Sequence, residues 1–169
     1  MIRSAIINDA EAISKLGKQS FFEAHETSAP KEELDAYLNN KLSEEIISQE
    51  LSDTNNIFHL HFYENELAGY SKIIYNSPPP QLPDVTDACK LERIYFLRKF
   101  YGKKLGLKLF NFNKNLCIQN NQSGMWLTVW IGNERAITFY EKLGFKTIGE
   151  IIFKVGKIES PNLVMWLEL

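Results

Sequence analysis

The chain has 169 residues, of which 44% are hydrophobic and 24% are charged, and its formal net charge is −2. This length and composition predict one globular domain, residues 1–169, with a hydrophobic core of its own. The near-neutral charge argues against a general affinity for nucleic acid, so we expect no nucleic-acid partner.

The cysteines and the first residues bear on the cellular compartment. Cys89 and Cys117 form no CxxC pair and have no spacing typical of a metal site, so we expect no bound metal. The opening segment Met1–Asn8 is too short and too polar for a signal peptide, and no apolar run approaches the ~18 residues of a membrane span. We therefore expect a soluble cytoplasmic protein with reduced cysteines and no membrane partner.

The N-terminal half of the chain predicts a short strand, three helices and a hairpin. Asn8 and Glu11 resemble a capping box, so the first helix should begin there and end near His25. Alternating apolar and polar residues, with His59 and His61 on one face, predict the first strand of the hairpin. The expected ranges are Ile2–Ile7, Ile57–Tyr63 and Leu67–Tyr75 for strands, and Glu32–Asn39 and Glu44–Leu51 for the second and third helices.

The C-terminal half predicts a strand–helix–strand–helix unit and a second hairpin, after a proline-rich loop at Asn76–Asp87. The two strands of that unit should form a parallel pair with a right-handed crossover. The fold class is therefore α+β, or α/β in three layers, with a mixed sheet. The expected elements are the strands Cys89–Leu97, Met125–Ile131, Phe145–Val155 and Asn162–Leu169, the helices Lys103–Gln119 and Asn133–Leu143, and a turn at Lys157–Pro161. Asn133 should be the N-cap of the last helix.

The stretch Leu91–Gly106 joins a predicted strand to a helix through a basic turn that contains glycine. Backbone N–H groups at the start of a helix, together with the positive end of its dipole, can hold an anion such as phosphate. Gly102 and Gly106 permit a close approach of the backbone, and Lys103 and Lys104 add positive charge. A solvated basic helix start explains these residues equally well, and the turn matches neither a Walker loop nor a Rossmann fingerprint.

Glu92 interrupts a strand that is otherwise mostly apolar. Partial burial would raise its pKa and let it take a proton near neutral pH. An ion pair with a neighbouring basic side chain, or a position facing water, is the simpler interpretation of this residue alone. Strict alternation would place Glu92, Ile94 and Phe96 on one face of the strand, and Leu91, Arg93 and Tyr95 on the other.

Tyr140 lies in the last predicted helix, within the run AITFYEKLGF. A tyrosine hydroxyl can donate a proton to a leaving group of similar pKa, such as a thiolate. Taken alone, Tyr140 is more simply an aromatic residue that packs into the core beside Phe139. Trp126 and Trp130 are likewise more typical of a core or of the wall of a cleft.

A stronger signal comes from segments taken together: LERIYF, the basic turn YGKKLG, WLTVW and GNERAITFYEKLGF. Their order and spacing over residues 57–155 resemble the GNAT superfamily of acyl-CoA-dependent N-acetyltransferases, and the pattern N-x-x-A-x-x-F-Y-x-K-x-G-F is the most specific part. Within the superfamily the chain resembles PaiA-type spermidine/spermine acetyltransferases most, through KEELDAYL, LSEEIISQEL and FYENELAGY. The resemblance implies a mixed, mostly antiparallel sheet of about seven strands flanked by helices, with its central parallel pair splayed.

The resemblance also implies roles for individual residues. Glu92 would deprotonate the incoming ammonium, directly or through water, and Tyr140 would protonate the departing thiolate of CoA. The acetyl-CoA site would be formed by the backbone of Ile94, Tyr95 and Phe96 along the pantetheine arm, by Tyr101, Gly102, Lys103, Lys104, Leu105, Gly106 and Leu107 around the pyrophosphate, and by Asn133, Ala136 and Lys142 in the last helix.

The basic turn departs from the usual pattern of the superfamily, Q/R-x-x-G-x-G/A, at two positions. Tyr101 stands in place of Gln or Arg, and Lys104 stands in place of the first Gly. A positive φ at Lys104 would cost about 1 kcal/mol. Because helix starts have ordinary φ values, we expect Lys104 to lie in the first helical turn, where its charge favours an anion.

The resemblance implies a primary amine as the acceptor, and a polyamine such as spermidine or spermine in particular. Glu23, Glu26 and Glu92 would suit a polycation, and Trp126 would add to the substrate site. The alternatives are an acceptor that is a peptide, an amino acid or an aminoglycoside, or a protein that binds acyl-CoA as a sensor without turnover. Pairing of relatives through their C-terminal strands also makes a homodimer an expectation.

Overall fold

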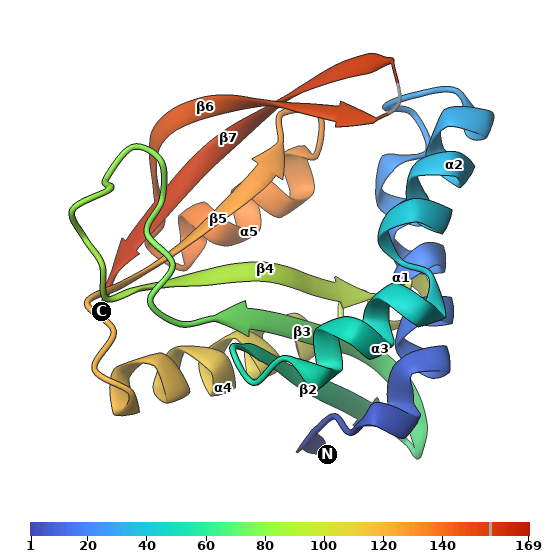
Figure 1. The fold of residues 1–169 in the computed structure, drawn as a ribbon, viewed down its shortest axis with the longest axis horizontal. Helices are drawn as coiled ribbons and strands as arrows, with labels where there is room; N and C mark the ends of the chain where they lie inside the picture. The colour runs from blue at the N-terminus through green and yellow to red at the C-terminus, as the bar shows by residue number, and fades with distance from the viewer. Residues whose placement is uncertain (156) are drawn as a thin grey trace.

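The computed structural model describes residues 1–155 and 157–169, and its centre is a seven-stranded sheet in the order β1-β2-β3-β4-β5-β7-β6 (Figure 1). Neighbouring strands are antiparallel except for β4 and β5, which are parallel. The strands are β1 (Ile2–Ser4), β2 (Asn56–Tyr63), β3 (Glu66–Ile74), β4 (Ala88–Phe96), β5 (Gly124–Trp130), β6 (Lys146–Val155) and β7 (Ile158–Glu168). The mixed, mostly antiparallel sheet expected from the sequence is confirmed.

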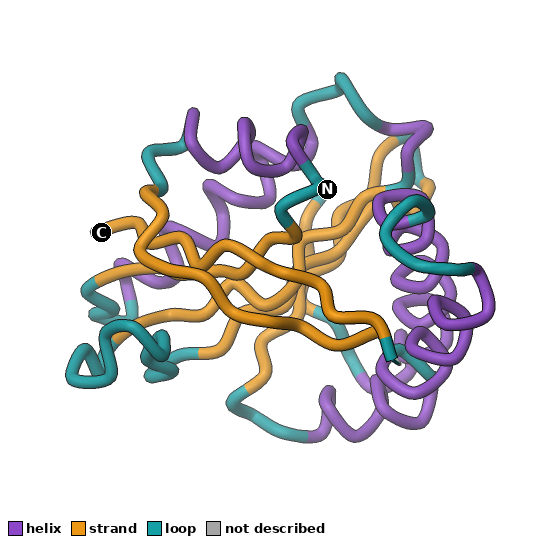
Figure 2. Tube along the Cα trace, turned by 90° about the horizontal axis from the view of Figure 1, so that it is seen from above, coloured by secondary structure: helices purple, strands orange, loops and turns teal. Residues whose placement is uncertain are grey.

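Helices lie on both sides of this sheet (Figure 2). The ring of Phe58 on the strand β2 stacks with Tyr70, whose hydroxyl lies against Gly17 of the first helix, whereas the ring of His59 contacts Phe112 of the helix α4. Because side chains alternate across a strand, these contacts place the N-terminal helices and α4 on opposite faces. The helices are α1 (Ala10–His25), α2 (Lys31–Lys41), α3 (Glu44–Ser52), α4 (Leu105–Gln119) and α5 (Glu134–Lys142), with the short 3-10 helices η1 (Ile7–Asp9) and η2 (Arg98–Phe100). No helix in the described part of the chain is long and apolar enough to span a membrane.

The parallel pair separates soon after it begins. The paired residues of β4 and β5 are Ala88 with Gly124, Cys89 with Met125 and Lys90 with Trp126. Beyond Lys90, β4 continues beside β3 and β5 continues beside β7, so the two strands diverge (Figure 1). The expected splay of the central pair is confirmed, and beyond Lys90 it leaves one edge of β4 without a strand neighbour among the described residues.

A β-bulge in β4 corrects the expected distribution of its side chains. Lys72 pairs with Arg93 and Ile73 pairs with Leu91, so Glu92 is an extra residue with no partner on β3. An extra residue reverses the alternation on one side of the bulge. Leu91 therefore packs in the cluster that contains residues of α4, and the carboxylate of Glu92 reaches Lys72 instead of lying with Ile94 and Phe96.

Three predictions at the ends of elements are wrong. The first strand ends at Ser4 instead of Ile7. The predicted capping residue Asn8 is replaced by Asp9, whose side chain accepts a hydrogen bond from the Ile6 N–H at 2.8 Å. The predicted turn at Lys157–Pro161 is wrong because β7 already begins at Ile158. Pro161 lies in the part of β7 that extends beyond the end of β5, since the last paired residues of those two strands are Trp130 and Asn162. Pro161 is paired there with β6 alone, and proline is tolerated at such an edge position.

Candidate active site

A cleft of about 1120 Å³ opens where β4 and β5 diverge. Its walls come from α1, α2, β4, the η2–α4 turn, β5, α5, β6 and β7. The splay thus brings together residues that are far apart in the sequence. The predicted site residues that line the cleft are Glu23, Glu92, Ile94, Tyr95, Phe96, Tyr101, Gly102, Lys104, Leu105, Gly106, Leu107, Asn133, Ala136, Tyr140 and Lys142.

Lys103, Glu26 and Trp126 do not line this cleft. The Nζ of Lys103 lies 4.7 Å from the centroid of the Tyr63 ring, and Glu26 forms an ion pair with Arg98 at 2.8 Å. Trp126 is 5% exposed because it lies opposite Lys90, where β4 and β5 are still paired. These three residues therefore lie outside the lining of the cleft, and their predicted part in binding stays a prediction.

The turn before α4 has an unusual backbone. Lys104 is the N-cap of α4 and has left-handed dihedral angles, φ 58° and ψ 18°. The expectation that Lys104 lies in the first helical turn is therefore wrong, and the position carries the strain of about 1 kcal/mol that a non-glycine residue has there. Gly102 has φ 80°, and a Cβ at Gly102 would meet no heavy atom within 4 Å, so the conformation alone favours glycine at that position.

The same turn presents N–H groups to the cleft. The amide of Lys108 donates to the carbonyl oxygen of Lys104 at 3.2 Å, which is the first bond of the α4 ladder. The amides of Leu105, Gly106 and Leu107 precede that bond, so the helix itself offers them no acceptor. This helix start, with Lys104 beside it, fits an anionic group such as a pyrophosphate.

A second source of positive charge was missed by the sequence analysis. The guanidinium carbon of Arg135, on α5, lies 3.3 Å from the centroid of the Tyr101 ring, and both residues line the cleft. Lys142, one of the predicted residues, lines it from the same helix. Tyr101 stands where the superfamily usually has Gln or Arg, and in this chain it instead supports a cation brought from α5.

The start of α5 is capped as predicted. The Oδ1 of Asn133 accepts a hydrogen bond from the Ala136 N–H at 3.2 Å. Tyr140, farther along α5, packs edge-on against Phe139 and Phe145, with ring centroids 5.4 and 5.6 Å away. Burial raises the pKa of the Tyr140 hydroxyl above its ordinary value, with the Tyr95 hydroxyl adding to the effect. At neutral pH this hydroxyl therefore carries its proton and can donate it.

The unpaired edge of β4 supplies further donors. The Leu97 N–H donates to the carbonyl oxygen of Ala68 on the β3 side at 3.1 Å. Because successive residues of a strand direct their N–H groups to opposite sides, the Phe96 N–H points toward the open side, where β5 has left. An extended chain with amide groups can pair with this edge, and a negative oxygen can be held there.

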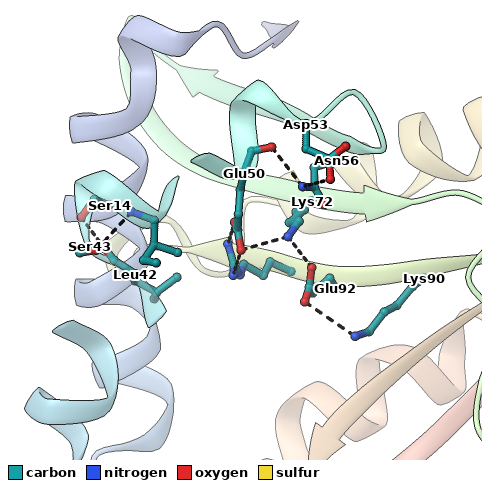
Figure 3. A network of polar contacts seen from close by, with 11 residues as sticks. Ser14, Leu42, Ser43, Glu50, Asp53, Asn56, Lys72, Lys90 and Glu92 are labelled. Carbon is teal, nitrogen blue, oxygen red and sulfur yellow. Dashed lines mark hydrogen bonds and ion pairs between the residues drawn. The ribbon is translucent and has the colours of Figure 1, made fainter. Parts of the chain in front are cut away.

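Glu92 belongs to a network of charged side chains (Figure 3). The Nζ of Lys72 lies 2.7 Å from Glu92 Oε2 and 3.1 Å from Glu50 Oε1, and the Nζ of Lys90 lies 3.7 Å from Glu92 Oε1. Arg93 donates to both carboxylate oxygens of Glu50, at 2.6 and 2.9 Å. Lys72 is only 3% exposed, so the network is largely shielded from water.

This network corrects the expected pKa of Glu92. Burial works to raise the pKa of the carboxyl, but the positive charges of Lys72 and Lys90 outweigh it and hold the pKa below the ordinary value of 4.5. The interpretation of Glu92 as an ion-paired residue is confirmed, and the raised pKa is not. Glu92 is therefore ionised at neutral pH.

The match to known families agrees with this geometry. The family described as "Acetyltransferase (GNAT) family" matches residues 12–145. The chain therefore belongs to the GNAT family of acetyltransferases and is an acetyl-CoA-dependent N-acetyltransferase.

The similarity to known relatives and to solved structures covers most of this chain. An uncharacterised N-acetyltransferase of Lactobacillus delbrueckii subsp. lactis is 26% identical over 89% of this chain and 86% of its own. The structure of a PaiA N-acetyltransferase of Thermoplasma acidophilum in complex with coenzyme A has a TM-score of 0.81 at 19% identity, covering 100% and 98% of the two chains. The structure of mutant forms of the spermidine/spermine N-acetyltransferase SpeG of Vibrio cholerae has a TM-score of 0.69 at 18% identity, covering 99% of this chain and 93% of that chain.

Proposed function

We propose that this acetyltransferase moves the acetyl group of acetyl-CoA directly to a primary amine, within the cleft between β4 and β5. The observation that carries the proposal is that one cleft combines a start of α4 suited to an anion, an unpaired edge of β4 and the protonated hydroxyl of Tyr140. These are the parts that binding a phosphorylated thioester and releasing a thiolate require.

Binding of the donor substrate divides between the two ends of the cleft. The amides of Leu105–Leu107 and the charges of Lys104, Arg135 and Lys142 would hold the pyrophosphate. The open edge of β4 would pair with the amides of the pantetheine arm, and the thioester would then lie near Phe96 and Tyr140. Most of the rate then comes from positioning, since no covalent intermediate with the protein is needed.

The transfer proceeds through one tetrahedral intermediate. The ammonium of the acceptor first loses a proton, and the free amine attacks the thioester carbonyl carbon, forming the C–N bond. The Phe96 N–H donates to the resulting oxyanion. As the oxyanion collapses, the C–S bond breaks and the sulfur takes the proton of Tyr140. The second proton of the attacking nitrogen then leaves and restores the tyrosine hydroxyl, so the products are an amide, CoA thiol and one proton released to solvent.

Glu92 fits the first step as an orienting group. Because its pKa is below 4.5, the carboxylate does not hold a proton at neutral pH. It can instead attract the ammonium and orient a water molecule that carries the proton away. This role retains Glu92 at the acceptor end of the cleft without the raised pKa that the sequence suggested.

The polyamine acceptor has less support than the reaction itself. The carboxylates expected to bind a polycation are already engaged: Glu23 accepts a hydrogen bond from the Arg98 N–H at 2.6 Å, Glu26 pairs with Arg98, and Glu92 pairs with Lys72. We therefore propose a primary amine and retain spermidine as an alternative that the experiment decides.

The experiment follows the release of CoA thiol from acetyl-CoA in the presence of separate amines. Thiol release that depends on an amine supports the proposal, and release with spermidine above all others supports the polyamine acceptor. Tight binding of acetyl-CoA without thiol release from any amine, including peptides and aminoglycosides, would contradict the proposal and favour a sensor.

A further inference from the structure

The acceptor end of the cleft is walled by aromatic side chains from separate elements. On α1, Phe21 and His25 stack with ring centroids 4.0 Å apart. Tyr37, on α2, lies 5.3 Å from Phe21, and Tyr95, on β4, lies 6.2 Å from it. All of these residues line the cleft. The helices α1 and α2 thus bring the rings of Phe21, His25 and Tyr37 together in this wall.

The opposite wall of the cleft also consists of aromatic rings. Trp130, on β5, lies 5.7 Å from His25, and Phe153, on β6, lies 5.7 Å from Tyr37 in an edge-on arrangement. The strand β6 runs toward α2 (Figure 1), and the contact between Phe153 and Tyr37 joins the two elements there. We call the set Phe21, His25, Tyr37, Tyr95, Trp130 and Phe153 the aromatic chamber.

The chamber adjoins the reacting groups. Tyr95 belongs to it, and the Tyr95 hydroxyl is close enough to Tyr140 to contribute to the raised pKa of that residue. Tyr95 also stands on β4 between Ile94 and Phe96, at the edge where the donor would pair. A group seated among the rings would therefore extend from the amine that attacks the thioester.

Charge in the cleft disfavours a second ammonium at this place. Among the described residues, the acidic side chains of the lining are Glu23 and Glu92, and both already have partners. Among the basic side chains of the lining, Lys90, Arg93 and Arg98 also pair with carboxylates, and the proposed function assigns Lys104, Arg135 and Lys142 to the pyrophosphate. Burial lowers the pKa of His25, so its ring is neutral at neutral pH and behaves as one more uncharged wall. A polycation would find each carboxylate of the described lining already engaged, whereas a neutral aromatic group needs no carboxylate.

We propose that the acceptor is a primary amine that carries an aromatic substituent, which the aromatic chamber holds while the amine faces the thioester. This inference rests on the proposed function and specifies its substrate class. The rings meet at tilted and edge-on angles, an arrangement that favours a further flat ring over a flexible chain.

The test compares amines that differ in their substituent. Binding of 2-phenylethylamine, ethylamine and spermidine to the full chain with CoA present is measured by calorimetry, and thiol release is measured with each amine and acetyl-CoA. We expect 2-phenylethylamine to bind about 30-fold more tightly than ethylamine, as burial of a phenyl ring allows. Equal affinity for the two, or a preference for spermidine, would overturn the inference.

Variants of the chamber supply the matched comparison. Phe153→Leu and Tyr37→Leu should raise the KM for 2-phenylethylamine about 5-fold or more and leave the KM for acetyl-CoA unchanged, while Tyr37→Phe, which keeps the ring, should raise the KM for 2-phenylethylamine less than Tyr37→Leu does. The control is Ile152→Val, since Ile152 is the neighbour of Phe153 on β6 and is 58% exposed. Leucine variants that leave the preference among amines unaltered would also overturn the inference.

Separate outcomes contradict the acetyl transfer and the aromatic acceptor. Absence of thiol release with every amine contradicts the proposed function, and the calorimetric ranking then still decides whether the chamber prefers an aromatic amine. Thiol release with no preference for 2-phenylethylamine contradicts only the aromatic acceptor.

Discussion

The guanidinium of Arg135 lies over the ring of Tyr101, with its central carbon 3.3 Å from the ring centroid. The contact joins the N-terminal part of α5 to the turn before α4, the two sides of the end of the cleft that suits phosphate. It provides a cation at a place where the superfamily pattern expects the turn itself to provide Gln or Arg.

Replacing Arg135 with Met should therefore weaken the donor site. We expect the KM for acetyl-CoA to rise about 10-fold, the loss typical of one charge-assisted phosphate contact, with kcat nearly unchanged. Tyr101→Leu should give a smaller rise of the same kind, because it removes the support of Arg135 and not its charge. Steady-state kinetics at varied acetyl-CoA check this, and an unchanged KM in both variants would remove the pair from the donor site.

Lys104→Gly should separate backbone strain from charge. Glycine accepts the left-handed conformation of this N-cap, so we expect a gain in stability of about 1 kcal/mol and a rise in melting temperature of about 2–4 °C. The lost charge should raise the KM for acetyl-CoA. Lys103→Gly is the control, since Lys103 has no positive φ, and it should not be stabilising. A lower melting temperature for Lys104→Gly than for the control would contradict the strain.

Lys72→Met should destabilise the fold strongly. Lys72 is 3% exposed and lies between Glu50 and Glu92, so its removal leaves two carboxylates facing each other with fewer partners. Loss of one member of a buried ionic network costs about 3 kcal/mol. Chemical denaturation measures this loss, and Lys90→Met, which removes a partner at 3.7 Å, should cost much less. Equal effects of the two variants would contradict the central place of Lys72.

Buried histidines should make stability depend on pH between 7 and 5. Burial lowers the pKa of His59 and His61 below the ordinary value of 6.5. The unfolded chain therefore binds protons that the folded chain does not, so stability is greatest above pH 6.5 and falls as the pH decreases below it. Melting temperatures measured across this range should fall, and His59→Gln should reduce the fall. A melting temperature that rises toward pH 5 would contradict this.

The order of elements could be predicted from the sequence because each element has its own local signal. Alternation marked β2, and Asn133 marked the start of α5 as a side-chain cap, which the structure confirms. The motif around Tyr140 also predicted a residue that lines the cleft. Such signals depend on a few neighbouring residues, so they can be recognised in the sequence without knowing the fold.

The features that were not predicted depend on contacts between residues distant in the sequence, or on backbone details that leave no periodic pattern. The bulge at Glu92 adds one residue to a strand, and alternation alone cannot show it. The pairing of Glu23 and Glu26 with Arg98 joins α1 to the turn before α4, and the stacking of Arg135 on Tyr101 likewise joins separate segments. The position of Trp126 outside the lining of the cleft depends on the point where β4 and β5 diverge, which cannot be inferred from either strand alone.

Thiol release by the Tyr140→Phe variant tests the central claim most directly. The variant keeps the ring that packs against Phe139 and Phe145 and removes only the hydroxyl that is protonated at neutral pH. With the best amine acceptor, we predict that kcat falls about 100-fold while the Kd for acetyl-CoA stays the same. A kcat within about 2-fold of the parent, at equal acetyl-CoA affinity, would show that Tyr140 is not the acid and would contradict the account.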